Sequence, residues 1–199
     1  MSKANTLQRI LKLPESPERT AAIAAWVQSL FPAPPVLVGG AAVELYTRGA
    51  YTSGDFDFVG GVPPTVANQL SAEGFQREGR HWIREAGQIF VEFPSSVLNP
   101  EEKTTTLTLG GHKVLTVVPE VLIVDLLAAW QFWKSGVDGV NAVLVWKARR
   151  ASLDQRYLGK LAKTRGTEKS LRRLREFAKR HSRRAPTQEE IEEWADQRS

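Results

Sequence analysis

The sequence contains no cysteine among its 199 residues. A disulfide framework, a thiolate nucleophile and a thiolate metal site are therefore all excluded. Any metal ion must bind carboxylates, water or one of three histidines, and this donor set favours magnesium or manganese over zinc. The histidines are weak candidates, because His81 and His112 stand near predicted turns without partner ligands at metal-binding spacing, and His181 lies in a basic segment.

The sequence also lacks a long apolar run. Its richest stretch runs from Val117 to Trp133. Glu120, Asp125 and Gln131 interrupt this stretch, whereas a membrane-spanning helix needs roughly 20 consecutive apolar residues. The first residues, MSKANTLQRILKLPES, contain neither an uninterrupted apolar segment nor the small-residue cleavage site of a secretory signal. We therefore expect a cytoplasmic location and no membrane association.

The composition is that of a globular protein. Hydrophobic residues make up 42% of the chain and charged residues 25%, which is compatible with a substantial core. The length suits one ordinary domain with a small appended unit. From Pro119 onward the sequence becomes first apolar and then strongly basic, with helical spacing. We therefore predict two parts: residues 1–118, which carry the candidate site, and residues 119–199, which are helical.

A short apolar strand pattern, Val36–Val38, ends at Gly39 and Gly40 and is followed by a segment with helical preference, Ala41–Tyr46. Glycines between a strand and a helix let backbone N–H groups approach a phosphate closely. The N-terminus of the helix adds a favourable dipole. The order of these elements predicts a phosphate-binding turn at Gly39 and Gly40.

The next strand pattern, DFDFV from Asp55 to Val59, alternates acidic and apolar residues. Because residues two apart on a strand share one face, Asp55 and Asp57 project together, and their like charges repel unless a cation lies between them. Magnesium is typically bound by one or two carboxylates together with substrate phosphates. The aspartate pair therefore predicts a metal site close to the phosphate-binding turn.

A third acidic residue, Glu92, lies in the strand pattern Ile89–Phe93, where Val91 and Phe93 point to the opposite face. Two-metal nucleotidyl transfer generally needs a third carboxylate. We therefore identify Glu92 as a candidate to hold the catalytic metal and to take the proton from an acceptor hydroxyl. The alternative interpretation is a solvent-facing glutamate, which is common on hairpin surfaces.

The remaining patterns predict helices and short strands. Before Pro119 we expect helices at residues 17–30 and 64–70, a strand at 75–77, and hairpins formed by 82–84 with 88–93 and by 104–109 with 113–117. After Pro119 we expect helices at 121–133, 140–148, 153–162, 168–181 and 188–195, the last of them opened by a capping box of Thr187 and Glu190. The predicted fold class is α+β, with a small mixed or antiparallel sheet flanked by helices and followed by a helical region.

The glycine pair, the Asp-x-Asp strand and the later acid, in this order, resemble the core motif of the DNA polymerase β-like nucleotidyltransferase superfamily. The match reads VLVGGAAVELYTRGAYTSGDFDFV from Val36 to Val59, with Glu92 as the later acid. The segment YTSGDFDF and the downstream segment VPEVLIVDLLAAWQFWKSGVDGVNAVLVWKA are similar to small prokaryotic stand-alone members, some of which act as abortive-infection or toxin–antitoxin enzymes. The resemblance covers about residues 36–148, and its first block is the specific one.

The resemblance implies a mixed sheet of nucleotidyltransferase type. It also implies transfer of a nucleoside monophosphate from a triphosphate to a hydroxyl of an RNA such as tRNA, of a protein or of a small molecule. The residues implied to contact the triphosphate are Gly39, Gly40 and Ser53, with Thr52 as a second candidate. The residues implied to bind Mg²⁺ or Mn²⁺ are Asp55, Asp57 and Glu92.

Two cations of many relatives are absent from this chain. An arginine often stands four residues before the first aspartate, where this chain has Tyr51. A lysine often precedes the downstream aspartate, where Val137 precedes Asp138. Arg48 and Lys134 are the candidates to replace these cations. The departures keep open an alternative to the enzyme: a non-catalytic nucleic-acid-binding protein, or one component of a toxin–antitoxin pair, on the same fold.

The excess positive charge of the chain lies between Lys147 and Arg184. The acidic residues of this segment are Asp154, Glu168 and Glu176. Between its two ends the basic residues are Arg149, Arg150, Arg156, Lys160, Lys163, Arg165, Lys169, Arg172, Arg173, Arg175, Lys179, Arg180 and Arg183. One interpretation is a solvated helix surface. The other is contact with the phosphate backbone of an RNA such as tRNA, or with an acidic protein partner.

Overall fold

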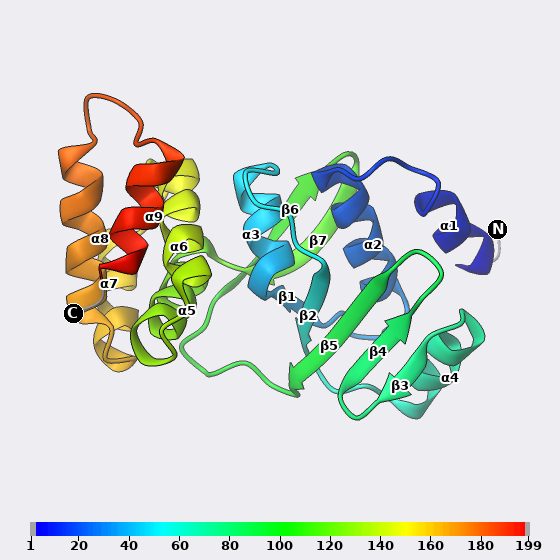
Figure 1. Cartoon of the computed structure of the whole chain (residues 1–199). Coiled ribbons are helices and arrows are strands. Elements are labelled where there is room, and N and C mark those ends of the chain that lie inside the picture. Colours follow the sequence, from blue (N-terminus) through cyan, green and yellow to red (C-terminus); the bar gives the residue numbers. More distant parts are fainter. Residues whose placement is uncertain (1–2, 198–199) are drawn as a thin grey trace. The chain divides into compact units, whose positions relative to one another are not determined.

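A computed structural model describes residues 3–197 and divides the chain into two compact units, Met1–Val117 and Val118–Ser199 (Figure 1). The first unit combines helices with a sheet, and the described part of the second is helical. Between residues 3 and 197, no helix combines the length and the apolar character that crossing a membrane requires.

The first unit contains α1 (Lys3–Ile10), α2 (Pro17–Ser29), β1 (Val36–Val38), α3 (Gly39–Thr47), β2 (Asp55–Val59), α4 (Pro64–Ala72), β3 (Gln76–Glu78), β4 (His81–Arg84), β5 (Ile89–Ser95), β6 (Thr104–Leu109) and β7 (His112–Val117). The second unit contains α5 (Pro119–Phe132), α6 (Gly136–Arg149), α7 (Gln155–Thr164), α8 (Glu168–Arg180) and α9 (Gln188–Asp196).

The strands of the first unit form one mixed sheet in the order β3-β4-β5-β2-β1-β7-β6. In its centre, β1 pairs antiparallel with β2 and parallel with β7, and β2 pairs parallel with β5. Antiparallel pairs, β3–β4–β5 on one side and β6–β7 on the other, complete the sheet. The predicted α+β class, with a mixed sheet flanked by helices and followed by a helical region, is confirmed.

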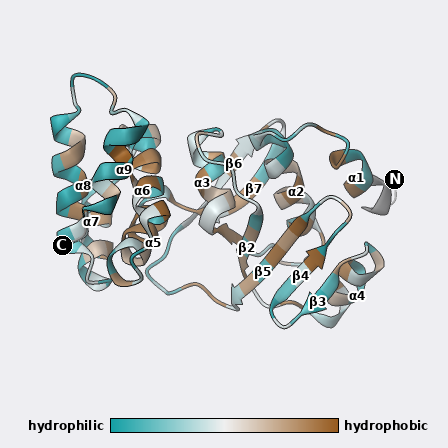
Figure 2. Ribbon diagram, viewed as in Figure 1, coloured by the Kyte–Doolittle hydropathy of each residue, from teal (hydrophilic) through white to brown (hydrophobic). Residues whose placement is uncertain are grey.

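An aromatic layer joins helix α2 and the sheet. Phe58 of β2 is fully buried and lies 5.9 Å from the ring of Phe93 on β5. Phe31, just beyond α2, lies 5.7 Å from Phe93, and Trp26 of α2 stacks on Phe75 at 6.0 Å. Large aromatic side chains dominate the energetics of a protein core, and Figure 2 shows strand β5 of this layer as largely hydrophobic. Because side chains alternate along a strand, the aspartates of β2 point to the opposite face.

Helix α6 begins at Gly136, four residues earlier than the sequence predicts. The Ser135 hydroxyl accepts a hydrogen bond from the N–H of Asp138 at 3.4 Å and so caps this earlier start. Gly139 permits close packing, because a Cβ there would lie 2.8 Å from Cδ1 of Trp130. Gly139, which weakens the helical pattern in the sequence, therefore allows helix α6 to approach helix α5. The capping box of α9, formed by Thr187 and Glu190, is present as predicted.

A buried carboxylate, Glu44 of α3, connects three segments of the first unit. Its side chain is only 2% exposed. The hydroxyl of Thr20 on α2 donates to Oε1 at 2.8 Å, and the backbone N–H of Ser53 donates to Oε2 at 2.9 Å. Buried polar groups are stable only when they are hydrogen-bonded. Glu44 therefore fixes α3 against α2 and against the loop that leads into β2.

We expect Glu44→Ala to lower the free energy of unfolding by roughly 2–4 kcal/mol, because it leaves the buried Thr20 hydroxyl and the partly buried Ser53 N–H without an acceptor and creates a cavity. Glu44→Gln should retain most of the stability, since one amide oxygen still accepts from Ser53 while the Thr20 hydroxyl rotates to accept from the amide NH₂. Urea unfolding followed by tryptophan fluorescence measures both. Equal stability of Glu44→Ala and the unsubstituted protein would contradict this role.

Candidate active site

The glycine pair forms the first turn of helix α3. The helix begins at Gly39, two residues before the sequence-predicted start, and its N-cap, Val38, provides no side-chain hydrogen bond. Gly39 has a φ of 62°, which is the left-handed region that favours glycine. The first N–H groups of an α-helix have no partner within the helix. This turn therefore presents backbone donors and the positive end of the helix dipole, as an anion site requires.

Helix α3 approaches the aspartate strand at van der Waals distance. A Cβ built on Gly39 would lie 2.3 Å from Oδ2 of Asp57. A Cβ built on Gly40 would lie 2.6 Å from the hydroxyl of Ser53. The structure therefore brings the glycine turn, Asp57 and Ser53 together, and any larger side chain at either glycine would have to displace one of them.

The sheet register places the acidic residues side by side. Val38 at the end of β1 is opposite Asp57, and Asp57 is in turn opposite Glu92 on the parallel strand β5. Asp55 is exposed, whereas Asp57 and Glu92 are partly buried. Because these strands pair in register, Asp55, Asp57 and Glu92 lie on one face of the sheet.

The electrostatics of this face are unfavourable for its central carboxylate. Burial, together with the negative charges of Glu92 and then Asp55, raises the pKa of Asp57 from 3.8 to about 6. The nearby side chains of His81 and Arg80 lower this pKa only in part. A partly buried carboxylate next to two others is a site where negative charge has accumulated without full compensation.

Two side chains that were not predicted as site residues, Arg80 and His81, contact Glu92. Nε of Arg80 lies 2.7 Å from Oε1 of Glu92, and Nδ1 of His81 lies 3.5 Å from Oε2. His81 is opposite Glu92 in the β4–β5 pairing. The predicted turn of residues 85–87 would pair Arg84 with Gln88 and His81 with Val91. In the structure Arg84 pairs with Ile89, so the register is shifted by one residue and His81 is opposite Glu92.

The residues of this face fit a hard divalent cation through the chemistry of their donors. Carboxylate oxygens are the preferred protein ligands of Mg²⁺ and Mn²⁺. The raised pKa of Asp57 marks the charge that such a cation would neutralise. With Glu92 directed to Arg80 and His81, no group of three or more acidic or histidine side chains between residues 3 and 197 has the arrangement of a metal site. Asp55 and Asp57 are therefore the better-supported pair of metal ligands. Glu92 would bind the metal with them only after its carboxylate separates from Arg80 and His81.

A cleft of about 240 Å³ adjoins the site on the side of the loop before β2. Its lining includes Thr52, Ser53, Gly54, the exposed Phe90 and Arg19 of α2. The backbone of this loop is fixed, because the Ser53 hydroxyl donates to the carbonyl of Asp55 at 3.0 Å and the Ser53 N–H is held by Glu44. The predicted contacts Thr52 and Ser53 therefore stand where the cleft meets the glycine turn.

Arg19 is a cation of this cleft that the sequence did not suggest. Its side chain is 15% exposed, and its Nη1 lies 3.6 Å from the largely exposed Glu15. Its buried Nε has no hydrogen-bond partner. An arginine with unused donors beside Thr52 and Ser53 is suited to bind an anion.

The structure shows where Arg48 and Lys134, the two candidates to replace the absent cations, lie. Arg48 follows the last residue of α3. At 1.5 Å per residue, it lies about 13 Å along the helix axis from Gly39 and cannot reach the glycine turn, so this expectation is wrong. Lys134 lies in the second unit, after α5. Tyr51, at the position of the absent arginine, lies beside the turn, with its Cε1 3.4 Å from a Cβ built on Gly40.

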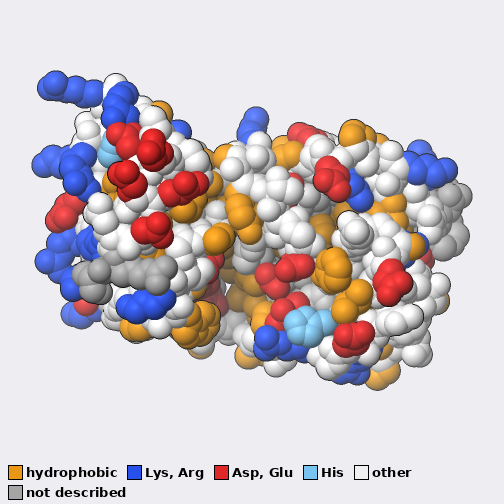
Figure 3. All heavy atoms as spheres, viewed as in Figure 1, with side chains coloured by type: hydrophobic (Ala, Val, Ile, Leu, Met, Phe, Trp, Pro, Cys, Tyr) orange, Lys and Arg blue, Asp and Glu red, His pale blue; other side chains and the backbone are white. Residues whose placement is uncertain are grey.

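Figure 3 shows these charges on the surface of the first unit. A group of acidic side chains lies next to a histidine and basic side chains, in the region that strands β2, β4 and β5 occupy in Figure 1. Hydrophobic side chains border the group on the same face. The acidic face is therefore accessible from solvent in the first unit.

Comparison with protein-family models finds no match for this sequence, and no curated protein matches it. Among solved structures, the chain is similar to an antigenic nucleotidyltransferase-like protein from Paracoccidioides brasiliensis. The TM-score is 0.52 and the sequence identity 20%, and the match covers 79% of this chain and 94% of that chain. This likeness establishes a nucleotidyltransferase-like fold.

The raised pKa of Asp57 predicts how stability depends on pH. Between pH 3.8 and about 6 the folded protein holds a proton that the unfolded chain has lost, so the metal-free protein should lose stability as pH rises through this window. The loss approaches roughly 3 kcal/mol above it. We expect Asp57→Asn to abolish this loss and to be the more stable protein at pH 7.5 in the presence of EDTA.

The melting temperature, measured across this pH range, reports the effect. Glu85→Gln is the control, because Glu85 is exposed in the turn between β4 and β5. Mg²⁺ should raise the melting temperature of the unsubstituted protein but not that of Asp57→Asn. A pH dependence that Asp57→Asn leaves unchanged would show that this carboxylate does not carry the accumulated charge.

Gly39→Ala should disturb the site through both backbone strain and collision with Asp57. We expect a loss of roughly 1–3 kcal/mol in the free energy of unfolding and the loss of stabilisation by Mg²⁺. Gly111→Ala is the matched control, because Gly111 also has a positive φ, of 80°, but a Cβ there meets no atom within 4 Å. If the two variants respond alike to Mg²⁺, the close approach at Gly39 is not needed for the site.

Proposed function

We propose that the chain is a metal-dependent nucleotidyltransferase that moves a nucleoside monophosphate from a nucleoside triphosphate to a hydroxyl group. The observation that carries the proposal is the contact between the glycine turn of α3 and Asp57, which puts an anion site next to accumulated carboxylates. The nucleotidyltransferase-like fold supports it independently. A nucleoside triphosphate with its divalent cation satisfies both parts of this site, since the phosphates would bind at the glycine turn and the cation at the carboxylates.

Asp55 and Asp57 would hold the divalent cation, Mg²⁺ or Mn²⁺, and Glu92 would complete the set. Bound there, the cation would supply Lewis-acid stabilisation of charge on the phosphates. The backbone N–H groups of Gly39 and Gly40 orient the phosphate chain, and the Ser53 hydroxyl, with Thr52 beside it, binds its oxygens. These roles require no conformational change in the backbone that Glu44 fixes.

The transfer forms a bond between the acceptor oxygen and the α-phosphorus and breaks the bond from that phosphorus to the bridging oxygen. Pyrophosphate leaves with the electron pair of the broken bond. The proton of the acceptor hydroxyl passes to a carboxylate, and Glu92 is our candidate because it lies next to Asp57 on the same face. Arg80 and His81 would be released from Glu92 and could then pair with phosphate oxygens.

Two further residues would act on the nucleotide from the cleft. Arg19 would supply the cation for the phosphates that is absent at the position of Tyr51. Arg19 lines the cleft together with Thr52 and Ser53, and its buried Nε has no hydrogen-bond partner. Phe90 would offer a flat surface to the base, because its side chain is 40% exposed next to Asp55 in the strand register.

The acceptor in this proposal is an RNA, with tRNA as one example. The basic segment from Lys147 to Arg184 supports this choice, because a polyanionic acceptor would be held there by its phosphates. In Figure 3 basic side chains line the outer edge of the second unit, over α8 as labelled in Figure 1. A small-molecule acceptor, or a protein acceptor without an acidic surface, would make no use of this charge.

A second candidate function is a nucleic-acid-binding protein without catalysis, or the corresponding component of a toxin–antitoxin pair with an acidic protein partner. The observation that favours it is the engagement of Glu92 by Arg80 and His81. In that protein Arg80, together with the hydrogen-bonding ring of His81, would take the place of the metal beside Glu92. RNA binding would then need neither Mg²⁺ nor Asp57.

Incubation with each α-phosphate-labelled nucleoside triphosphate, Mg²⁺ and total RNA tests the proposal. We expect label to enter RNA with the unsubstituted protein and to be lost with Asp57→Asn, which removes a ligand charge without removing a packed group. Circular dichroism shows whether the variant remains folded. Equal labelling by both proteins would contradict the proposal, and labelling of the protein fraction alone would contradict an RNA acceptor.

Arg19 is tested in the same assay. Arg19→Ala should need a triphosphate concentration roughly tenfold higher for half-maximal labelling, which corresponds to the loss of one charge-assisted hydrogen bond. Arg9→Ala is the matched charge control, because Arg9 is exposed at the end of α1 and does not line the cleft. An unchanged concentration dependence in Arg19→Ala would remove Arg19 from the site.

A further inference from the structure

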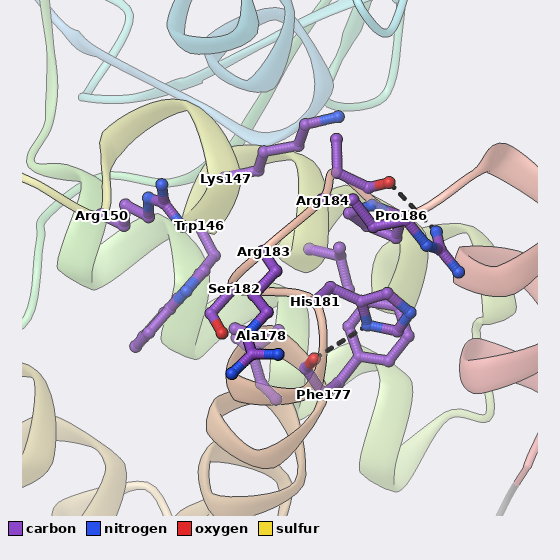
Figure 4. A pocket seen from close by; sticks show the side chains of 13 residues that line it. Trp146, Lys147, Arg150, Phe177, Ala178, His181, Ser182, Arg183, Arg184 and Pro186 are labelled. Atoms are coloured by element: carbon purple, nitrogen blue, oxygen red, sulfur yellow. Dashed lines mark hydrogen bonds between the residues drawn. The ribbon is translucent and has the colours of Figure 1, made fainter.

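The helical unit contains a second cavity, of about 420 Å³, between α6, α8 and the segment that joins α8 to α9. Figure 4 shows Trp146 on one side of this pocket and Phe177 and His181 on the other. Cavities of about 300–1,000 Å³ are typical of small-molecule sites. The combination of size and aromatic walls therefore marks a ligand pocket separate from the carboxylate face.

One aromatic wall is held rigidly in place. The ring of His181 lies 4.4 Å from that of Phe177, and its Nδ1 lies 2.9 Å from the Phe177 carbonyl. Phe177 in turn lies 5.4 Å from Trp194, which stacks on Trp130 at 4.4 Å. The wall is thus an extension of the aromatic core of this unit, and it needs no rearrangement to receive a flat ligand.

The segment that closes the pocket is fixed by Glu190 of α9. Its carboxylate accepts two hydrogen bonds from the guanidinium of Arg184 and one from the N–H of Thr187 at 2.8 Å, and it lies 3.7 Å from Nε2 of His181. The Arg184 hydrogen bonds hold the pKa of Glu190 far below its usual value. The negative charge of Glu190 therefore compensates Arg184 of the closing segment.

Three other cations line the pocket without compensation. Lys147, Arg150 and Arg183 are exposed, and none of them pairs with a carboxylate in the described part of the chain. Figure 4 labels all three around the same opening as Trp146. Free cations beside aromatic faces match a ligand that has a flat ring and negative charge.

We propose that this pocket binds one unstacked nucleotide of a single-stranded RNA, with the base between Trp146 and the Phe177–His181 wall and the backbone phosphates on Lys147, Arg150 and Arg183. A strand is favoured over a free nucleotide because three separate cations suit successive phosphates. An acidic peptide would leave the aromatic walls unused. The inference deepens the RNA-acceptor part of the proposed function, but it requires no metal, no triphosphate and no catalysis.

Binding of a fluorescently labelled single-stranded oligoadenylate of about ten nucleotides, a length within the usual site sizes, tests the proposal by anisotropy in EDTA. We expect Arg183→Ala and Trp146→Leu each to weaken binding roughly tenfold. Arg183→Ala should also reduce the slope of log K against log salt by about 0.7. Arg183 lies on an exposed segment, so this variant keeps the test valid if Trp146→Leu is unstable.

Arg9→Ala is the charge control, because Arg9 is exposed on α1 and lies outside both the pocket and the basic segment. Asp57→Asn should bind the oligonucleotide as the unsubstituted protein does, which separates this test from the proposed catalysis. Equal affinities of Arg183→Ala, Trp146→Leu and Arg9→Ala would overturn the proposal.

Two competitors identify the ligand. AMP should displace the oligoadenylate only at much higher concentration, since it supplies one phosphate in place of several. Polyglutamate should compete poorly, since it has no ring to stack. If AMP binds as tightly as the oligonucleotide, the ligand is a free nucleotide and the proposal of an RNA strand is wrong. If polyglutamate competes as well as the oligonucleotide, the ligand is an acidic protein and the proposal of a nucleotide is wrong.

Discussion

The close approach of helix α3 to strand β2 is the constraint on which the candidate site depends. Glu44 fixes this approach from the buried side, by accepting hydrogen bonds from Thr20 and from the Ser53 backbone. Gly39 and Gly40 permit it on the exposed side, where a Cβ would meet Asp57 or Ser53. The helix N-terminus and the acidic strand are thereby held in contact before any ligand binds.

The same approach creates an electrostatic cost in the metal-free protein. The sheet brings Asp57 next to Glu92 and partly buries it, so the pKa of Asp57 rises to about 6. Accumulated charge of this kind is common where a ligand supplies the compensation, and it trades stability for binding. Arg80 and His81 reduce the cost at Glu92 in the meantime. Stability and the proposed function are therefore coupled through one group of carboxylates.

How much the sequence predicts depends on how local each feature is. The glycine turn and Asp55 with Asp57 are set by neighbouring residues in a strand–turn–helix–strand order, so pattern alone finds them, and the fold class follows from the same order. His81 beside Glu92 was not predicted, because the turn between β4 and β5 is one residue longer than the pattern indicates and shifts the register of the hairpin. Glu44 could not be found, because its partners come from α2 and from the following loop and depend on tertiary packing. The pocket of the helical unit could not be predicted either, because its lining comes from α6 and α8, which are brought together by tertiary packing.

The most direct measurement of the central claim is an X-ray structure of the protein with Mn²⁺ and a non-hydrolysable nucleoside triphosphate, recorded with anomalous scattering. The account predicts an anomalous peak in contact with the carboxylates of Asp55 and Asp57. It also predicts phosphate oxygens at the backbone N–H groups of Gly39 and Gly40. A triphosphate bound away from the glycine turn, or manganese bound without either aspartate, would contradict it.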